Sequence, residues 1–186
     1  MAEYKVIKGD ATRPEGEGEK RIVIPHVVND IGKWGRGFVL AINKRWGTGV
    51  MTAYQQWFSG TKLEDIEEDL VSYPVPSSDR FASIICQDPF KLGSAQFVLV
   101  PDRVCIANMV GQHGCYNGSD GRPPIRYGAL AKSMELVTHL CINNTEIHCP
   151  KFGSDLSGGH WPTIELMIKE IWVDAGIPVT VYEWEG

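Results

Sequence analysis

The sequence lacks the features that mark membrane, secreted and disulfide-bonded proteins. No apolar run approaches the ~20 residues that span a bilayer, and no secretory signal follows Met1. The five cysteines are an odd number and contain no Cys-x-x-Cys pair, which argues against a disulfide framework. No His-x-His or paired-Cys motif predicts a metal site. We therefore expect a soluble, cytoplasmic protein with reduced thiols, no metal and no membrane partner.

Positive charge is also scarce. Lys and Arg number 18 against 23 Asp and Glu, which gives a net charge of −5, so the composition predicts no surface for bulk nucleic-acid binding. A hydrophobic content of 43% is ordinary for a globular protein, and 186 residues are close to the size of one domain. We expect a single domain over residues 1–186 and a monomer.

Two common nucleotide-binding motifs are missing, namely the P-loop GxxxxGK(S/T) and the dinucleotide fingerprint GxGxxG. The sequence has instead two glycine loops, each between a predicted strand and a predicted helix. The first, residues 29–37, follows a β-branched run and precedes a helical pattern that starts at Phe38. The second, residues 150–161, precedes a helix with Pro162 in its first turn. Such loops direct N–H groups and a helix dipole at an anion, although glycines after a strand also make simple tight turns.

The rest of the chain alternates strands with helices. This order predicts an α/β fold with helices on both sides of a mixed sheet. Residues 59–92 are treated as an insertion or lid, with a short helix at 62–69 and a strand near 81–86. Ligands of such sheets bind beyond the carboxyl ends of the strands, so the two glycine loops should converge on a diphosphate-containing ligand. The other predicted strands are 4–8, 22–28, 95–100, 104–110, 146–149 and 178–184, and the helices are 38–46, 52–58, 125–140 and one from 162 to about 175.

Five segments, taken in order, resemble the macro domain family, whose members bind ADP-ribose. They are residues 6–12, 26–30 with 34–38, 107–114 with 123–127, 153–161 and 179–182, so the resemblance spans nearly the whole chain. The resemblance implies a three-layer α/β/α fold with a mixed central sheet and ADP-ribose as ligand, with no cofactor. It is closest to the branch of the terminal ADP-ribose protein glycohydrolase and the yeast ADP-ribose-1″-phosphate phosphatase. The pattern shared with that branch is His26, Asn29, Trp34, Gly35 and Gly37.

The resemblance also implies which residues contact the ligand. Asp10 would accept a hydrogen bond from the adenine amino group, Tyr182 would lie against the adenine, and Trp34 would border the distal ribose. The two glycine loops would hold the diphosphate between them. The complete implied set is Asp10, Ala11, Trp34, Gly35, Arg36, Gly37, Phe38, Gly153, Ser154, Asp155, Leu156, Ser157, Gly158, Gly159 and Tyr182.

The candidate catalytic residues are His26, Asn29, Asp30 and Gln112. His26 and Asp30 could form an acid/base pair that activates water. In the hydrolase hypothesis Asn29 and Asp30 position the water, and His26 or Gln112 assists. The alternative is that His26 is a structural strand histidine and that Asp30 only caps the loop. The glycohydrolase carries a catalytic lysine and an aspartate whose places fall here at residues 110–112 and at Ser157, which makes its lysine mechanism doubtful for this chain.

Two hypotheses for the function follow. The first is a hydrolase that acts on ADP-ribose-1″-phosphate or on an ADP-ribosylated macromolecule, and the polar cluster at residues 26–30 favours it. The second is a reader that binds ADP-ribose without turnover. The missing lysine favours a reader, or a phosphatase over a lyase.

Overall fold

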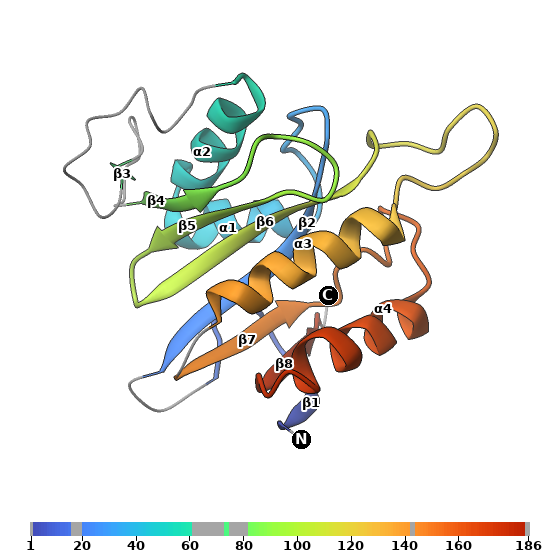
Figure 1. Ribbon diagram of the computed structural model, residues 1–186. Coiled ribbons are helices and arrows are strands. Elements are labelled where there is room, and N and C mark those ends of the chain that lie inside the picture. Colours follow the sequence, from blue (N-terminus) through green and yellow to red (C-terminus); the bar gives the residue numbers. More distant parts are fainter. Residues whose placement is uncertain (1, 16–19, 61–72, 75–81, 142–143, 185–186) are drawn as a thin grey trace.

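The computed structural model describes residues 2–15, 20–60, 73–74, 82–141 and 144–184. Within these residues eight strands form one sheet in the order β1-β8-β7-β2-β6-β5-β4-β3 (Figure 1). The first five strands of that order run parallel, and the last three pair antiparallel. The strands are β1 Tyr4–Lys8, β2 Arg21–Asn29, β3 Tyr73–Pro74, β4 Ser83–Gln87, β5 Ala95–Val100, β6 Val104–Gln112, β7 Thr145–Pro150 and β8 Val179–Glu183.

Helices cover both faces of this sheet (Figure 1). The chain therefore has the predicted three-layer α/β/α fold with a mixed central sheet. Among the described residues no helix is both long and apolar enough to cross a membrane. The helices are α1 Phe38–Trp46 and α2 Gly49–Phe58 on one face, and α3 Tyr127–Leu140, α4 Trp161–Ile168 and the π-helical segment η2 Lys169–Val173 on the other.

Strand β2 shows how the sequence divides the core into two layers. Its side chains alternate across the sheet, so Val23 packs under α3 and α4, while Ile24 and Val28 pack under α1 and α2. Each layer also contains a buried indole: Trp172 in the layer under α3 and α4, and Trp46 in the layer under α1 and α2. Such continuous apolar strands are expected when both faces of a parallel sheet are covered.

The boundaries of the predicted elements agree with the described structure to within a few residues, but the short strand β3 was not predicted. The last helix does not continue regularly but widens into η2, where the N–H of Asp174 donates to the carbonyl of Lys169 at 2.9 Å. In α1 the buried residues are Val39, Ile42 and Trp46. The predicted helix at 62–69, and most of the insertion at 59–92, lie outside the described residues.

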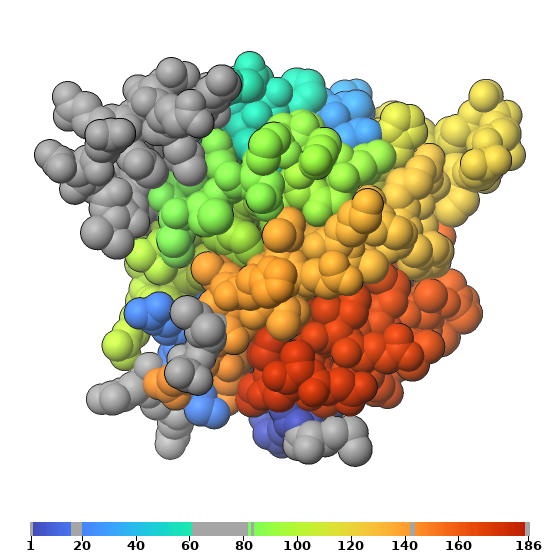
Figure 2. Space-filling view, in the orientation of Figure 1, coloured from blue at the N-terminus to red at the C-terminus, as the bar shows by residue number. Residues whose placement is uncertain are grey.

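Five chain segments follow the carboxyl ends of the parallel strands and therefore lie on the same side of the sheet. These strands are β1, β8, β7, β2 and β6, so both glycine loops meet on that side. The segment after β6, residues 113–126, is called the arm below. It stands out from the body of the molecule as the yellow projection in Figures 1 and 2.

Candidate functional site

A cavity of about 780 Å³ opens where the parallel strands end. Segments that follow β1, β2, β6, β7 and β8 all contribute to its wall, which confirms that the two glycine loops converge. The predicted site residues in its lining are Asp10, Ala11, His26, Asn29, Gly35, Arg36, Gly37, Phe38, Gln112, Gly153, Ser154, Asp155, Leu156, Ser157 and Tyr182.

One end of the cavity is built on β1 and β8. Asp10 forms a turn there, because its Oδ1 accepts from both the N–H and the hydroxyl of Thr12, at 2.9 and 2.8 Å. Asp10 therefore stabilises a turn and also lines the cavity. Tyr182 accepts from the N–H of Glu15 at 2.8 Å, and its hydroxyl lies 2.9 Å from Nδ1 of the buried His148. Burial raises the pKa of Tyr182.

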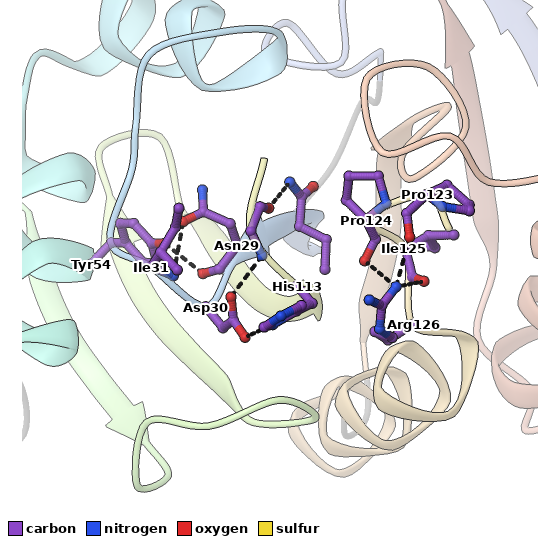
Figure 3. Close-up of polar contacts among 11 residues, drawn as sticks. Asn29, Asp30, Ile31, Tyr54, His113, Pro123, Pro124, Ile125 and Arg126 are labelled. Atoms are coloured by element: carbon purple, nitrogen blue, oxygen red, sulfur yellow. Dashed lines mark hydrogen bonds and ion pairs between the residues drawn. The ribbon is translucent and has the colours of Figure 1, made fainter. Parts of the chain in front are cut away.

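Asn29 shapes the first glycine loop from the other end of the cavity. Its Oδ1 accepts from the N–H groups of Ile31 and Lys33 at 3.1 and 3.0 Å, and its Nδ2 donates to the Lys33 carbonyl at 2.6 Å. The hydroxyl of Tyr54 lies 3.0 Å from the same Oδ1 (Figure 3). Asn29 thus lines the cavity while it fixes the path of the loop.

Replacing Asn29 by Ala should lower the free energy of unfolding by about 2 kcal/mol, because two loop N–H groups and one carbonyl lose their partner. Urea denaturation measures the change. The matched control is Asn117→Ala in the exposed arm, which should stay within about 0.5 kcal/mol of the wild type. Equal stability of the two variants would mean that water replaces the Asn29 contacts without loss.

Asp30 does not form the predicted pair with His26. Its Oδ2 lies 2.7 Å from Nδ1 of His113, and its Oδ1 accepts from the N–H of Gly114 at 2.8 Å (Figure 3). Asp30 is also not among the residues that line the cavity. Asp30 stands in the turn that directly follows β2. Through these contacts with His113 and Gly114, Asp30 instead holds the start of the arm against the end of β2.

Gln112 joins the arm to the second glycine loop. Its Nε2 donates to the carbonyl of Gly114 at 2.8 Å, and its Oε1 accepts from the hydroxyl of Ser157 at 2.6 Å. Ser157 stands where the resemblance places an aspartate, so that position serves a loop contact in this chain. The lysine's place, residues 110–112, begins with Val110, which is fully buried under α1 and α2, and ends with Gln112.

Gly158 and Gly159 differ from the other predicted residues of the second loop because neither lines the cavity. The N–H of Gly159 donates to the carbonyl of Gly153 at 2.9 Å, and the N–H of Gly158 donates to that of Asp155 at the same distance. These two bonds fold the loop back on itself. Both glycines therefore set the shape of the wall that Gly153 and its neighbours form.

Trp34 is a core residue and not the predicted cavity wall. The residue is only 9% exposed, and its Nε1 donates to Oδ1 of Asn43 at 3.1 Å. The ring centroid lies 5.4 Å from that of Tyr54 and 5.6 Å from that of His26. The loop held by Asn29 turns the indole under α1, where it is removed from water.

His26 is buried at the floor of the cavity, 1% exposed. Its Nε2 lies 2.6 Å from Oδ1 of Asn108. Burial lowers the pKa of His26 to about 4, against a smaller opposite effect of the Asn108 hydrogen bond. The imidazole is therefore neutral near pH 7, and such a low pKa makes it a weak general base.

Sequence reasoning missed several residues that line the cavity. Lys33 and Trp184 lie in predicted segments, the first in the glycine loop and the second at the end of the last strand, so position alone could have suggested them. Cys115 and Tyr116 come from the arm, whose sequence gives no sign that it returns to the cavity. Tyr116 and Trp184 are 72% and 69% exposed and form an aromatic rim.

Comparison with known proteins places this geometry in a family, although no family model matches the chain. A protein of unknown function from Bacteroides thetaiotaomicron is 40% identical, with a TM-score of 0.77, over 97% of this chain and 98% of its own. A macrodomain protein from Streptomyces coelicolor is 33% identical, with a TM-score of 0.68, over 100% of both chains.

Two further proteins are more distant. The mouse chromodomain-helicase-DNA-binding protein 1-like is 26% identical over 178 residues, which are 95% of this chain but only 17% of that protein's length. DarTG of Thermosipho africanus, solved in complex with ADP-ribose, is 12% identical with a TM-score of 0.55, over 88% of this chain and 38% of its own, and shares the fold. The identity to the Streptomyces protein over the full length, together with the common fold, shows that this chain belongs to the macrodomain family.

Proposed function

We propose that the cavity binds ADP-ribose and that the protein hydrolyses an ADP-ribose derivative. The observation that carries the proposal is one continuous cavity with Asp10 and Tyr182 at one end, Asn29 and Gln112 at the other, and both glycine loops between them. Its volume of about 780 Å³ lies in the range of about 300–1,000 Å³ that is usual for small-molecule sites. A structural relative, the Thermosipho DarTG, has been solved with ADP-ribose bound.

The two loops suit a diphosphate between the adenine and distal ends. Gly37 has φ 78° and leads directly into α1, whose first turn carries no acidic residue, so the positive end of its dipole faces the cavity without a competing carboxylate. Lys33 and Arg36 from the same loop also line the cavity. These local donors and cations can hold an anion on a protein whose net charge is negative.

Hydrolysis needs a group that takes a proton from the attacking water. Asp10 and Asp155 are the carboxylates among the lining residues, and Asp10 is committed to the turn at the adenine end. We assign the base to Asp155. Water would attack the anomeric carbon or the terminal phosphorus, its proton would pass to Asp155, and the leaving group would depart with the electrons of the broken bond. Loop N–H groups would stabilise the developing charge.

A reader is the second candidate, and two observations favour it. The side chains of Asn29 and Gln112 already serve as braces of the loops, and Asp30 bonds the arm outside the cavity. Side chains that already hold the loops by hydrogen bonds are not free to take part in catalysis. Binding of ADP-ribose is common to both candidates.

Calorimetric titration with ADP-ribose and product analysis with ADP-ribose-1″-phosphate and ADP-ribosylated protein separate the candidates. We expect micromolar binding, about −8 kcal/mol, and release of phosphate or ADP-ribose. Asp155→Asn should lower turnover about 100-fold or more. Asp120→Asn in the exposed arm is the matched control and should behave as wild type. Binding without turnover would leave a reader, and no binding would overturn the proposal.

A further inference from the structure

A chain of hydrogen bonds runs from the protein surface to the end of the cavity that β1 and β8 form. The ammonium of Lys20 contacts Oε1 of Glu146, and Oε2 of Glu146 lies 3.4 Å from Nε2 of His148. Nδ1 of His148 lies 2.9 Å from the hydroxyl of Tyr182, which accepts from the N–H of Glu15 at 2.8 Å. His148 is 1% exposed and Tyr182 is 2% exposed, so the inner part of this chain is shielded from water.

The chemistry of Glu146 fixes the direction of the hydrogens. Burial acts to raise the pKa of Glu146, but the hydrogen bonds from Lys20 and His148 outweigh it and lower that pKa, so the side chain is a carboxylate that only accepts. Burial lowers the pKa of His148, against the opposite effect of Glu146, so the imidazole is neutral near pH 7 and carries one proton. That proton is on Nε2, facing Glu146, and the bare Nδ1 accepts from the Tyr182 hydroxyl.

The hydroxyl of Tyr182 is therefore fully used inside the protein. It donates to His148 and accepts from the N–H of Glu15, and neither of these two residues is among those that line the cavity. A ligand in the cavity cannot replace either bond without breaking this chain. The hydroxyl instead holds the segment of residues 9–15, which carries the lining residue Asp10.

This segment is tied to β8 at both ends. The N–H of Gly9 donates to the carbonyl of Glu183 at 3.0 Å, and the N–H of Glu15 donates to the Tyr182 hydroxyl. Between these ties the hydrogen bonds of Asp10 go only to the residues that follow it in the turn, and its Oδ2 has no partner among the described residues. Oδ2 is thus the oxygen left for a ligand, and its position depends on the ties to β8.

We propose that His148 is a positioning residue for adenine recognition: by accepting from the Tyr182 hydroxyl it holds the Glu15 tie, and with it the Asp10 carboxylate, where an adenine amino group can donate to it. The inference rests on the proposed binding of ADP-ribose and adds a residue that the ligand does not touch. Hypoxanthine has an oxygen in place of the adenine amino group and offers Asp10 no donor there. A correctly placed Asp10 therefore prefers ADP-ribose to its hypoxanthine analogue.

Calorimetry with ADP-ribose and this analogue, inosine diphosphate ribose, tests the inference. The wild type should prefer ADP-ribose about 30-fold, or about 2 kcal/mol. His148→Gln keeps an N–H that can reach Glu146 but has no acceptor at the place of Nδ1, so the preference should fall to about 3-fold or less. His148→Asn places its amide oxygen near the place of Nδ1 and should restore the preference. His139→Gln, at the exposed end of α3, is the control and should bind as the wild type does.

A double-mutant cycle shows whether His148 acts through Tyr182. Tyr182→Phe removes only the hydroxyl and should lower the preference as His148→Gln does. Because both substitutions break the same hydrogen bond, the double variant should be no worse than either single variant. Additive losses, or an equal preference in wild type and His148→Gln, would overturn the inference, as would a wild type without any preference. A wild type that binds neither ligand would instead refute the proposed function on which the inference rests.

Nitrogen-15 NMR of protein labelled at histidine tests the hydrogen bond itself, without any ligand. The His148 signals, assigned by their loss in His148→Gln, should show a protonated Nε2 and an Nδ1 that accepts a hydrogen bond. Tyr182→Phe should move the Nδ1 signal to that of a bare nitrogen. A protonated Nδ1 in the wild type, or an unmoved signal in Tyr182→Phe, would overturn the inference whether or not the protein binds ADP-ribose.

Discussion

Gly159→Ala should weaken ADP-ribose binding about 100-fold, or about 2.7 kcal/mol, although Gly159 itself does not line the cavity. A Cβ at this position would lie 2.3 Å from the carbonyl oxygen of Gly153 and 3.1 Å from Cδ1 of Ile164. The first neighbour is backbone, so the added atom is not accommodated by a side-chain rotation. The Gly159–Gly153 hydrogen bond of 2.9 Å must open, and the wall from Gly153 to Ser157 moves with it.

The loss is large because it affects several ligand contacts together. If the loop N–H groups hold the diphosphate, each charge-assisted bond that is misplaced costs about 1.5–3 kcal/mol. Overpacking of this kind also lowers the free energy of unfolding, by about 1–3 kcal/mol. Calorimetric titration and urea denaturation measure the two effects separately on the same protein.

Gly128→Ala is the matched control for this substitution. Gly128 lies exposed in the first turn of α3, and a Cβ there meets nothing within 4 Å. Alanine favours a helix over glycine by up to about 1 kcal/mol, so this variant should be as stable as the wild type or more so. Wild-type affinity in Gly159→Ala would mean that the second loop does not form the diphosphate site.

The fold could be predicted because its determinants are local. The β-branched run of β2 and the apolar spacing of α1 each identify an element without reference to the rest of the chain. The parallel strands then bring the two glycine loops together at their carboxyl ends, which is why the loops were predicted to converge. The π-helical segment after Ile168 was missed because the same apolar residues fit a regular helix.

The roles of individual polar residues could not be predicted in the same way. Asp30 bonds His113, and Gln112 bonds Ser157, across 83 and 45 positions of sequence. Nothing near Asp30 in the chain indicates a partner on the arm, so the nearby His26 was assigned instead. The resemblance placed Trp34 beside the distal ribose, but the contacts of Asn29 with the loop turn the indole into the core.

The stability of the protein should fall as the pH is lowered from about 7 to 4.5, and His26 should cause most of that change. The imidazole has a pKa of 6.5 when unperturbed but of about 4 in the fold, because burial disfavours its charged form. Between these values the unfolded chain binds a proton that the folded protein does not, so stability rises with pH across this window. The full difference corresponds to about 3 kcal/mol, of which about 2 kcal/mol is lost between pH 7 and 4.5.

Urea denaturation at pH 7 and 4.5 tests this in wild type, His26→Gln and the control His139→Gln. His26→Gln should lose about 2 kcal/mol of the pH dependence, whatever its stability at pH 7, and His139→Gln should keep it. Burial also lowers the pKa of His148, so a smaller slope of the same sign should remain in His26→Gln. The window ends at pH 4.5 because the contribution of carboxylates such as Glu165, whose pKa is lowered by the hydrogen bond from Lys169, is lost only at lower pH. An unchanged slope in His26→Gln would show that the imidazole is charged in the folded protein.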